Sequence, residues 1–192
     1  MRTFVLFIAF GFCRQVQAGF FEPIITVDQL DINKYLGRWY EISSSMIPKL
    51  TFQKNLVCTT ATYSLQSDGS IKVFNAGRIS KPTGVANNAT GKAVVVRNGT
   101  LLVTFPQSIN FFNANYFVVK LGNPTFGTQG LYEYAIVTTP FRLTAWVLAR
   151  NPQSFFANYQ KEVKDYLKYN GYNWFWNKPT PTVQTQDCIY PE

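Results

Sequence analysis

The side chains that most often perform catalysis or bind metals are scarce in this sequence. It contains no histidine, which removes the commonest general base and the commonest protein ligand of zinc and haem. The ten carboxylates are not paired at a spacing that suggests acid–base catalysis. Ser43, Ser44 and Ser45 have no base near them in the sequence, although an activated serine needs one. We therefore expect no enzyme, no catalytic residue, no metal and no cofactor.

The N-terminus has the pattern of a secretory signal peptide over residues 1–18. Arg2 supplies a positive charge, residues 4–12 form an apolar run, and Val16-Gln17-Ala18 is a small-residue cleavage site. The apolar run is too short to span a bilayer. The alternative is an N-terminal core strand or helix. We expect a secreted, extracellular protein whose single mature domain covers residues 19–192.

The cysteine count predicts one disulfide. Cleavage after Ala18 removes Cys13 and leaves Cys58 and Cys188, an even pair that is typically bonded in an oxidising compartment. This pairing also gives Cys58 a structural role in place of the nucleophilic role that a lone thiol could have. The bond would tie an early strand to the C-terminal tail.

Charge and composition describe a soluble surface. The net charge of +8 falls to +6 when the two arginines of the leader are removed, and the remaining cations form no run or stripe of the kind that binds nucleic acid. We therefore expect no nucleic-acid partner. Two sequons, at Asn88 and Asn98, predict glycosylated surface loops. Aromatic residues make up 17% of the chain, which fits either an aromatic core or an aromatic-lined cavity.

The chain after residue 33 consists mostly of short runs rich in β-branched and aromatic residues, which are typical of strands. The Asp68-Gly69 and Asn98-Gly99 pairs between such runs predict hairpin turns. Eight strands joined in this way suggest an up-and-down barrel or a sandwich. The predicted strands are Arg38–Ser45, Val57–Leu65, Ile71–Ile79, Thr90–Val96, Thr100–Phe105, Tyr116–Leu121, Tyr132–Thr138 and Ala145–Ala149.

A single helix is predicted after the last strand. Asn151 can cap it, Pro152 suits its first turn, and Gly171 is a good C-terminal stop. Apolar residues between them recur with helical spacing. This apolar stripe should pack on the outside of the sheet, and the polar tail from Asn177 should run along the surface to Cys188.

Three motifs resemble the lipocalin family. Gly37-Arg38-Trp39-Tyr40-Glu41 opens the first strand, Tyr132-Glu133-Tyr134-Ala135 stands near the seventh, and residues 146–152 end the last strand in Arg150 before a helix. The usual Thr-Asp before the second motif is replaced by Gln129-Gly130. The hairpin around Asp68-Gly69 is most similar to the group that contains apolipoprotein D and its bacterial and plant relatives.

The resemblance implies an all-β fold: an eight-stranded antiparallel up-and-down barrel with one C-terminal α-helix packed outside. It implies a carrier that binds a small hydrophobic molecule, such as a fatty acid, sterol, retinoid or bilin. Strand polarity then places Trp39 and Arg150 together at the closed floor, where a cation–π contact is worth up to about 2 kcal/mol. We expect this pair to be structural.

The same resemblance places Tyr63 and Asn75 in the ligand cavity. Alternation along the last strand puts Trp146 and Leu148 on the face of Arg150, and strand position suggests further cavity residues. The expected ligand-binding residues are Tyr63, Asn75, Phe105, Tyr116, Val118, Tyr134, Trp146 and Leu148.

The loops at the open mouth are unusually apolar, and two interpretations remain open. The side chains fold back as a lid over the cavity, or they touch a membrane, a lipoprotein surface or a receptor. We expect a monomer in either case. The apolar loop residues are Met46, Ile47, Leu50, Phe52, Ile109, Phe111 and Phe112.

Overall fold

The computed structural model describes residues 22–106 and 112–191. The predicted signal peptide and Cys13 lie outside the described residues, as do Ile109 and Phe111 of the mouth loops. The elements are α1 (Ile32–Tyr35), β1 (Gly37–Ser44), α2 (Met46–Leu50), β2 (Leu56–Leu65), β3 (Ile71–Ile79), β4 (Ala86–Arg97), β5 (Thr100–Thr104), β6 (Tyr116–Leu121), β7 (Pro124–Phe126), β8 (Leu131–Tyr132), β9 (Tyr134–Thr138), the 3₁₀ turn η1 (Pro140–Arg142), β10 (Ala145–Ala149), α3 (Pro152–Asn158), α4 (Gln160–Tyr169) and β11 (Thr180–Pro181).

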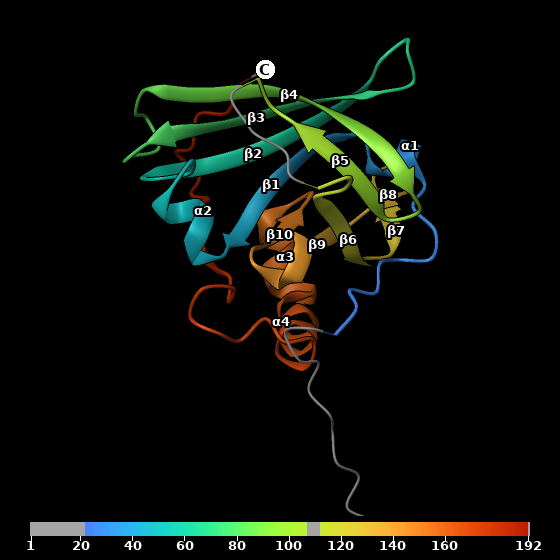
Figure 1. The fold of residues 1–192 in the computed structure, drawn as a ribbon. Helices are drawn as coiled ribbons and strands as arrows, with labels where there is room; N and C mark the ends of the chain where they lie inside the picture. Colours follow the sequence, from blue (N-terminus) through green and yellow to red (C-terminus); the bar gives the residue numbers. More distant parts are fainter. Residues whose placement is uncertain (1–21, 107–111, 192) are drawn as a thin grey trace, which may run out of the picture.

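Eight strands close into an antiparallel barrel (Figure 1). They follow one another in the order β1-β2-β3-β4-β5-β6-β9-β10, and β10 pairs with β1 to complete the ring. The predicted fold is confirmed, and each predicted strand corresponds to one of the eight. The largest difference in bounds is at β4, which begins at Ala86 rather than at Thr90. Asn88 therefore lies on an exposed strand instead of in a loop, whereas Asn98 is exposed in the β4–β5 turn.

The expected strand over Tyr132–Thr138 is interrupted at Glu133. Tyr132 pairs with Pro124 in the separate β7–β8 hairpin at the closed end of the barrel. The Glu133 carbonyl instead accepts a hydrogen bond from the backbone N–H of Arg150, at 3.0 Å. The chain thus turns from the hairpin into the barrel wall between these residues, and β9 starts at Tyr134.

Apolar side chains form two layers, one inside the barrel and one outside it. In β9, Ala135 and Val137 belong to the inner cluster, while Tyr134 and Ile136 belong to the outer cluster. This is the alternation that a barrel strand imposes. The outer cluster fills the space between the wall and the C-terminal helices, so the barrel has a second core on one side.

The predicted helix is two helices, α3 and α4, which lie outside the barrel as expected (Figure 1). The Asn151 side chain accepts from the Ser154 backbone N–H at 2.9 Å and caps α3. The two helices are separated at Tyr159, whose φ of −120° is not helical. Phe155, Val163 and Leu167 are buried in the outer cluster.

The barrel wall is weakest between β5 and β6, which pair at only two positions. Beyond this pairing, the Asn115 side chain takes over the role of a strand. Its Oδ1 accepts from the Val103 N–H and its Nδ2 donates to the Val103 carbonyl, both at 2.8 Å. The wall is thereby held together beside the cavity without a full ladder.

Candidate functional site

The floor of the barrel is sealed by Trp39 and Arg150. The Arg150 guanidinium lies 3.8 Å from the centroid of the Trp39 ring, and both residues are buried. Gly37 leaves room for it: φ is +90°, and a Cβ at this position would meet Arg150 Nη1 at 3.3 Å. This close approach explains why glycine opens the first strand.

The polar edge of the same guanidinium is occupied by the backbone. Arg150 donates to five carbonyl oxygens at 2.8–3.3 Å, those of Lys34, Tyr35, Leu36, Arg38 and Tyr132. Burial lowers the pKa of Arg150 to about 10, which still leaves it charged at neutral pH. Its hydrogen-bonding capacity is therefore directed at the backbone and away from a ligand.

Above the floor is a cavity of about 280 Å³, just below the usual range of ligand pockets. Apolar and aromatic side chains dominate its wall, and Glu41 is the only charged residue that lines it among the described residues. The lining consists of Glu41, Phe52, Gln53, Thr59, Thr60, Ala61, Tyr63, Val73, Asn75, Val103, Phe105, Asn115, Tyr116, Val137, Thr139, Thr144, Trp146 and Leu148.

Six of the eight expected ligand-binding residues lie on this wall: Tyr63, Asn75, Phe105, Tyr116, Trp146 and Leu148. The Asn75 amide has no hydrogen-bond partner among the described residues, so it is available inside the cavity. Val118 points inward but is fully buried in the inner cluster, level with the Gly99 turn, and does not reach the cavity.

Tyr134 was expected in the cavity and is instead outside the barrel. It belongs to the outer cluster, and its ring contacts those of Phe155 and Tyr159. Its hydroxyl donates to Glu162 of α4 at 2.8 Å. The expectation was wrong because the interruption at Glu133 sets the phase of β9, so that Ala135 and Val137 take the inward positions.

Three tyrosine hydroxyls meet at the deep end of the cavity. Tyr116 Oη lies 2.7 Å from Tyr35 Oη and 2.9 Å from Tyr63 Oη. Burial raises the pKa of Tyr63 to about 12 and that of Tyr35 and Tyr116 well above the ordinary value. All three phenols are therefore neutral at physiological pH and able to donate. We call this group the tyrosine cluster.

Glu41 organises the polar side of the cavity. Its carboxylate accepts from Gln53 Nε2 at 2.6 Å and from the Thr182 hydroxyl at 2.5 Å. Gln53 in turn accepts from Trp146 Nε1 at 3.4 Å. Glu41 is only 4% exposed. The network therefore joins β1, the loop after α2, the β10 wall and the C-terminal tail around one buried carboxylate.

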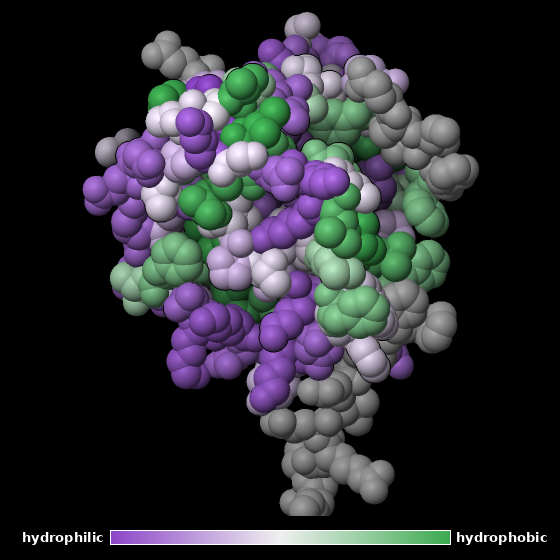
Figure 2. All heavy atoms as spheres, turned by 90° about the vertical axis from the view of Figure 1, so that its left-hand side faces the viewer, coloured by the Kyte–Doolittle hydropathy of each residue, from purple (hydrophilic) through white to green (hydrophobic). Residues whose placement is uncertain are grey.

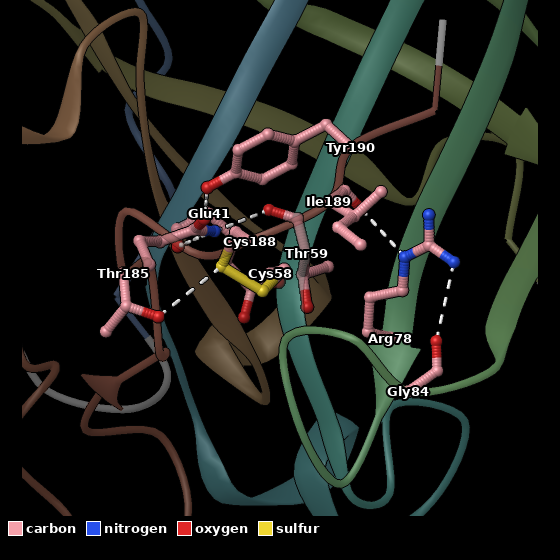
Figure 3. The surroundings of a disulfide bond; sticks show 10 residues. Glu41, Cys58, Thr59, Arg78, Gly84, Thr185, Cys188, Ile189 and Tyr190 are labelled. Atoms are coloured by element: carbon pink, nitrogen blue, oxygen red, sulfur yellow. Dashed lines mark hydrogen bonds between the residues drawn. A yellow bond between two sulfur atoms is a disulfide. The ribbon is translucent and has the colours of Figure 1, made fainter.

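The C-terminal tail completes the wall where β1 and β2 diverge (Figure 3). The Thr182 N–H donates to the Ile42 carbonyl, and the Cys58 N–H donates to the Val183 carbonyl. The Gln184 amide bridges the carbonyls of Glu41 and Thr59. The tail thus binds both strands and does not merely run along the surface.

The predicted disulfide is confirmed. Cys58 and Cys188 are bonded, with their Cα atoms 5.5 Å apart. Arg78 of β3 strengthens the attachment by donating to the Ile189 carbonyl at 2.7 Å. The bond fixes the tail next to the stretch in which it replaces direct β1–β2 pairing.

Four residues that line the cavity or support its wall were not predicted from the sequence: Glu41 and Asn115 on the wall, and Tyr35 and Thr182 behind it. Tyr35 lies three residues before the first predicted strand, and Asn115 lies just before another predicted strand. Thr182 belongs to a tail that carries no periodic signal. Glu41 belongs to the first motif and lies two residues after Trp39, on the same face of β1. Strand alternation from Trp39 could therefore have predicted its inward position.

No group of three or more His, Cys, Asp or Glu is close enough to hold a metal ion within residues 22–106 and 112–191. No helix in these segments has the length and apolarity needed to cross a membrane.

Comparison with known proteins agrees with this architecture. A family model described as a lipocalin-like domain matches residues 30–175. Apolipoprotein D of Macaca fascicularis is 34% identical over 148 residues, which cover 73% of this chain and 69% of the relative. The outer membrane lipoprotein Blc of Vibrio cholerae is 33% identical over 137 residues, which cover 70% of this chain and 72% of the relative.

Solved structures show the same fold at lower identity. Insecticyanin from the tobacco hornworm Manduca sexta matches with a TM-score of 0.62 and 19% identity, over 90% of this chain and 91% of that chain. Japanin from Rhipicephalus appendiculatus, solved with bound cholesterol, matches with a TM-score of 0.52 and 11% identity, over 79% of this chain and 95% of that chain. The family model spans most of the chain and the barrel is shared, so this protein belongs to the lipocalin family.

Proposed function

We propose that this protein is a secreted carrier that binds a small hydrophobic molecule in the barrel cavity. The observation that carries the proposal is a mostly apolar cavity with a few polar groups that are available for hydrogen bonding, Asn75 above all. Such a lining suits a guest with an apolar body and one polar group. The cholesterol bound to japanin supports a lipid-sized ligand. Export is supported by the leader pattern at residues 1–18 and by the disulfide.

The test is a titration of a fatty alcohol and the matching alkane against the wild type, Trp146→Ala and Asn75→Leu. Trp146→Ala removes an aromatic wall, so both probes should bind more weakly, by about 1–3 kcal/mol at roughly 25 cal/mol per Å² of lost contact. Asn75→Leu should weaken the alcohol and spare the alkane. Tyr169→Ala on the exposed face of α4 is the control and should change neither affinity. Unchanged binding of both probes by Trp146→Ala would exclude the cavity as the site.

A second candidate function is contact of the mouth with a membrane or lipoprotein surface. Figure 2 looks onto the mouth and shows apolar residues around its hollowed centre. Exposed apolar side chains come from α2 and its loop (Leu50, Phe52), from the β5–β6 connection (Phe112) and from the β9–β10 connection (Phe141, Leu143). A rim of this kind marks an interaction surface.

Charge favours an anionic surface as the partner. Among the described residues of the mouth loops, Lys54 and Lys81 are exposed cations and no carboxylate is present, and lysines near an anionic bilayer each add about 1 kcal/mol. Co-sedimentation with anionic and with neutral vesicles tests this. Leu50→Glu should reduce binding to anionic vesicles, while Tyr169→Glu on α4 should leave it unchanged. Equal sedimentation of Leu50→Glu and the wild type would refute the contact.

A further inference from the structure

The tyrosine cluster has one more hydrogen-bond donor than it can use. Three phenols carry three hydroxyl protons, yet only two hydroxyl–hydroxyl contacts join them, Tyr35–Tyr116 and Tyr63–Tyr116. The three hydroxyls have no other hydrogen-bond partner among the described residues. Whatever the direction of the two bonds, one proton is left over. A buried donor without an acceptor costs about 1–3 kcal/mol. An acceptor that binds this proton would therefore stabilise the cluster.

The spare proton faces the cavity. Tyr63 and Tyr116 line it, whereas Tyr35 does not and is only 2% exposed behind them. Tyr35 has no acceptor other than Tyr116, so the favourable arrangement has Tyr35 donating to Tyr116. The unused proton then belongs to Tyr116 or Tyr63. Either location presents a phenolic O–H to a guest at the deep end of the cavity.

The charges around the cavity favour a neutral acceptor over an anionic one. The cavity wall carries the Glu41 carboxylate and, among the described residues, no cation. The nearest buried cation on the floor, Arg150, directs its N–H groups at backbone carbonyls. A guest carboxylate would therefore share the cavity with the Glu41 carboxylate and would find no cation on the cavity wall to pair with, which is unfavourable for a buried charge.

We propose that the cavity selects neutral lipids that carry a carbonyl oxygen, such as ketones, and that this oxygen accepts the spare phenolic proton of Tyr63 and Tyr116. The proposal rests on the carrier function and names its ligand class. The guest would enter carbonyl first, with its apolar body along Trp146 and Leu148 toward the mouth. A free fatty acid of equal length would be a poorer guest.

The first experiment compares three probes on the wild-type protein: a long-chain methyl ketone, the alkane and the carboxylate of equal carbon number. The ketone should bind roughly three- to tenfold more tightly than the alkane, the net effect of one hydrogen bond. The carboxylate at neutral pH should bind more weakly than the ketone. The infrared carbonyl band of an isotope-labelled ketone should move to lower frequency on binding, relative to the same ketone in a hydrocarbon solvent.

Variants identify the donor. Tyr63→Phe/Tyr116→Phe removes both hydroxyls from the cavity wall, so the ketone should lose its advantage over the alkane and its infrared shift. Tyr35→Phe leaves two phenols with a single mutual hydrogen bond, so one proton stays free and both signals should persist. If the double variant does not fold because the Tyr35 hydroxyl is stranded, the triple variant with Tyr35→Phe removes that hydroxyl as well.

Each outcome separates this inference from the carrier function. Alkane and ketone that bind equally well, with no infrared shift, refute the carbonyl site and leave the carrier function standing. A carboxylate that binds as tightly as the ketone refutes the selectivity. A shift that survives in the double variant and disappears in Asn75→Leu assigns the donor to Asn75 and overturns the proposal. Failure of all three probes to bind would count against the carrier function itself.

Discussion

The disulfide between Cys58 and Cys188 closes a long loop, and its removal tests the role of the C-terminal tail. The two residues are 130 positions apart. In the chain-entropy model, a loop of this length destabilises the unfolded state by about 5 kcal/mol. We therefore expect Cys58→Ala/Cys188→Ala to lower the free energy of unfolding by about 3–5 kcal/mol.

A second effect follows from what the tail does in the folded state. Thr182 donates to the Glu41 carboxylate on the cavity wall, and Gln184 bridges β1 and β2. Without the cross-link these contacts must hold the tail unaided. We expect the tail to detach part of the time, so a cavity ligand should bind more weakly to the double variant than to the oxidised wild type.

The assay is guanidinium unfolding with the fluorescence of the tryptophans as the probe, together with a titration of the fatty alcohol. Reduced wild-type protein is the matched control and should resemble the double variant in both measurements. Thr185→Ala changes an exposed tail residue next to Cys188 and should have little effect. A double variant within about 1 kcal/mol of the wild type, with unchanged ligand affinity, would show that neither the loop entropy nor the tail contacts act as described.

Three further predictions concern the floor and the tyrosine cluster. Trp39→Ala should lower the free energy of unfolding by about 3–5 kcal/mol. Arg150→Ala should lower it by more than the roughly 2 kcal/mol of a cation–π contact, because buried carbonyls also lose their donor. Chemical denaturation measures both changes. The free energy of unfolding should fall as pH rises from about 10 toward 12, because the pKa of Tyr63 is raised to about 12 in the folded state and ionisation favours the unfolded chain. In a plot of the free energy of unfolding against pH, Tyr63→Phe should reduce the slope over this range. Gly37→Ala should also destabilise the fold, because φ is +90° and the new Cβ meets Arg150; a melting temperature equal to that of the wild type would contradict this.

Local patterns were sufficient for most of the barrel. Alternating β-branched and aromatic residues predict each of the eight strands, because a half-buried strand has a side-chain period of two. The Asp68-Gly69 and Asn98-Gly99 turns follow from residues that tolerate positive φ. Alternation from Arg150 was enough to place Trp146 and Leu148 on the cavity wall, where they lie.

Alternation fails wherever the chain leaves the ladder for a reason that is not local. The phase of β9 is set at Glu133, whose carbonyl accepts a hydrogen bond from the backbone N–H of Arg150, the residue after β10. Tyr134 consequently faces the helix instead of the cavity. The break between α3 and α4 at Tyr159 is likewise absent from the apolar spacing, which continues across it.

The sequence by itself determined the number of strands and the pairing of Cys58 with Cys188, because these depend on residue type, spacing and count. Its motifs, through their resemblance to the lipocalin family, supplied the barrel topology and the Trp39–Arg150 floor. The tertiary structure decided what the cavity can recognise. Tyr35, Tyr63 and Tyr116 come from three separate elements, and their hydroxyls share two hydrogen bonds only once the barrel has closed. Glu41 meets Thr182 from 141 residues away, and no local signal encodes a contact between segments so distant in the chain.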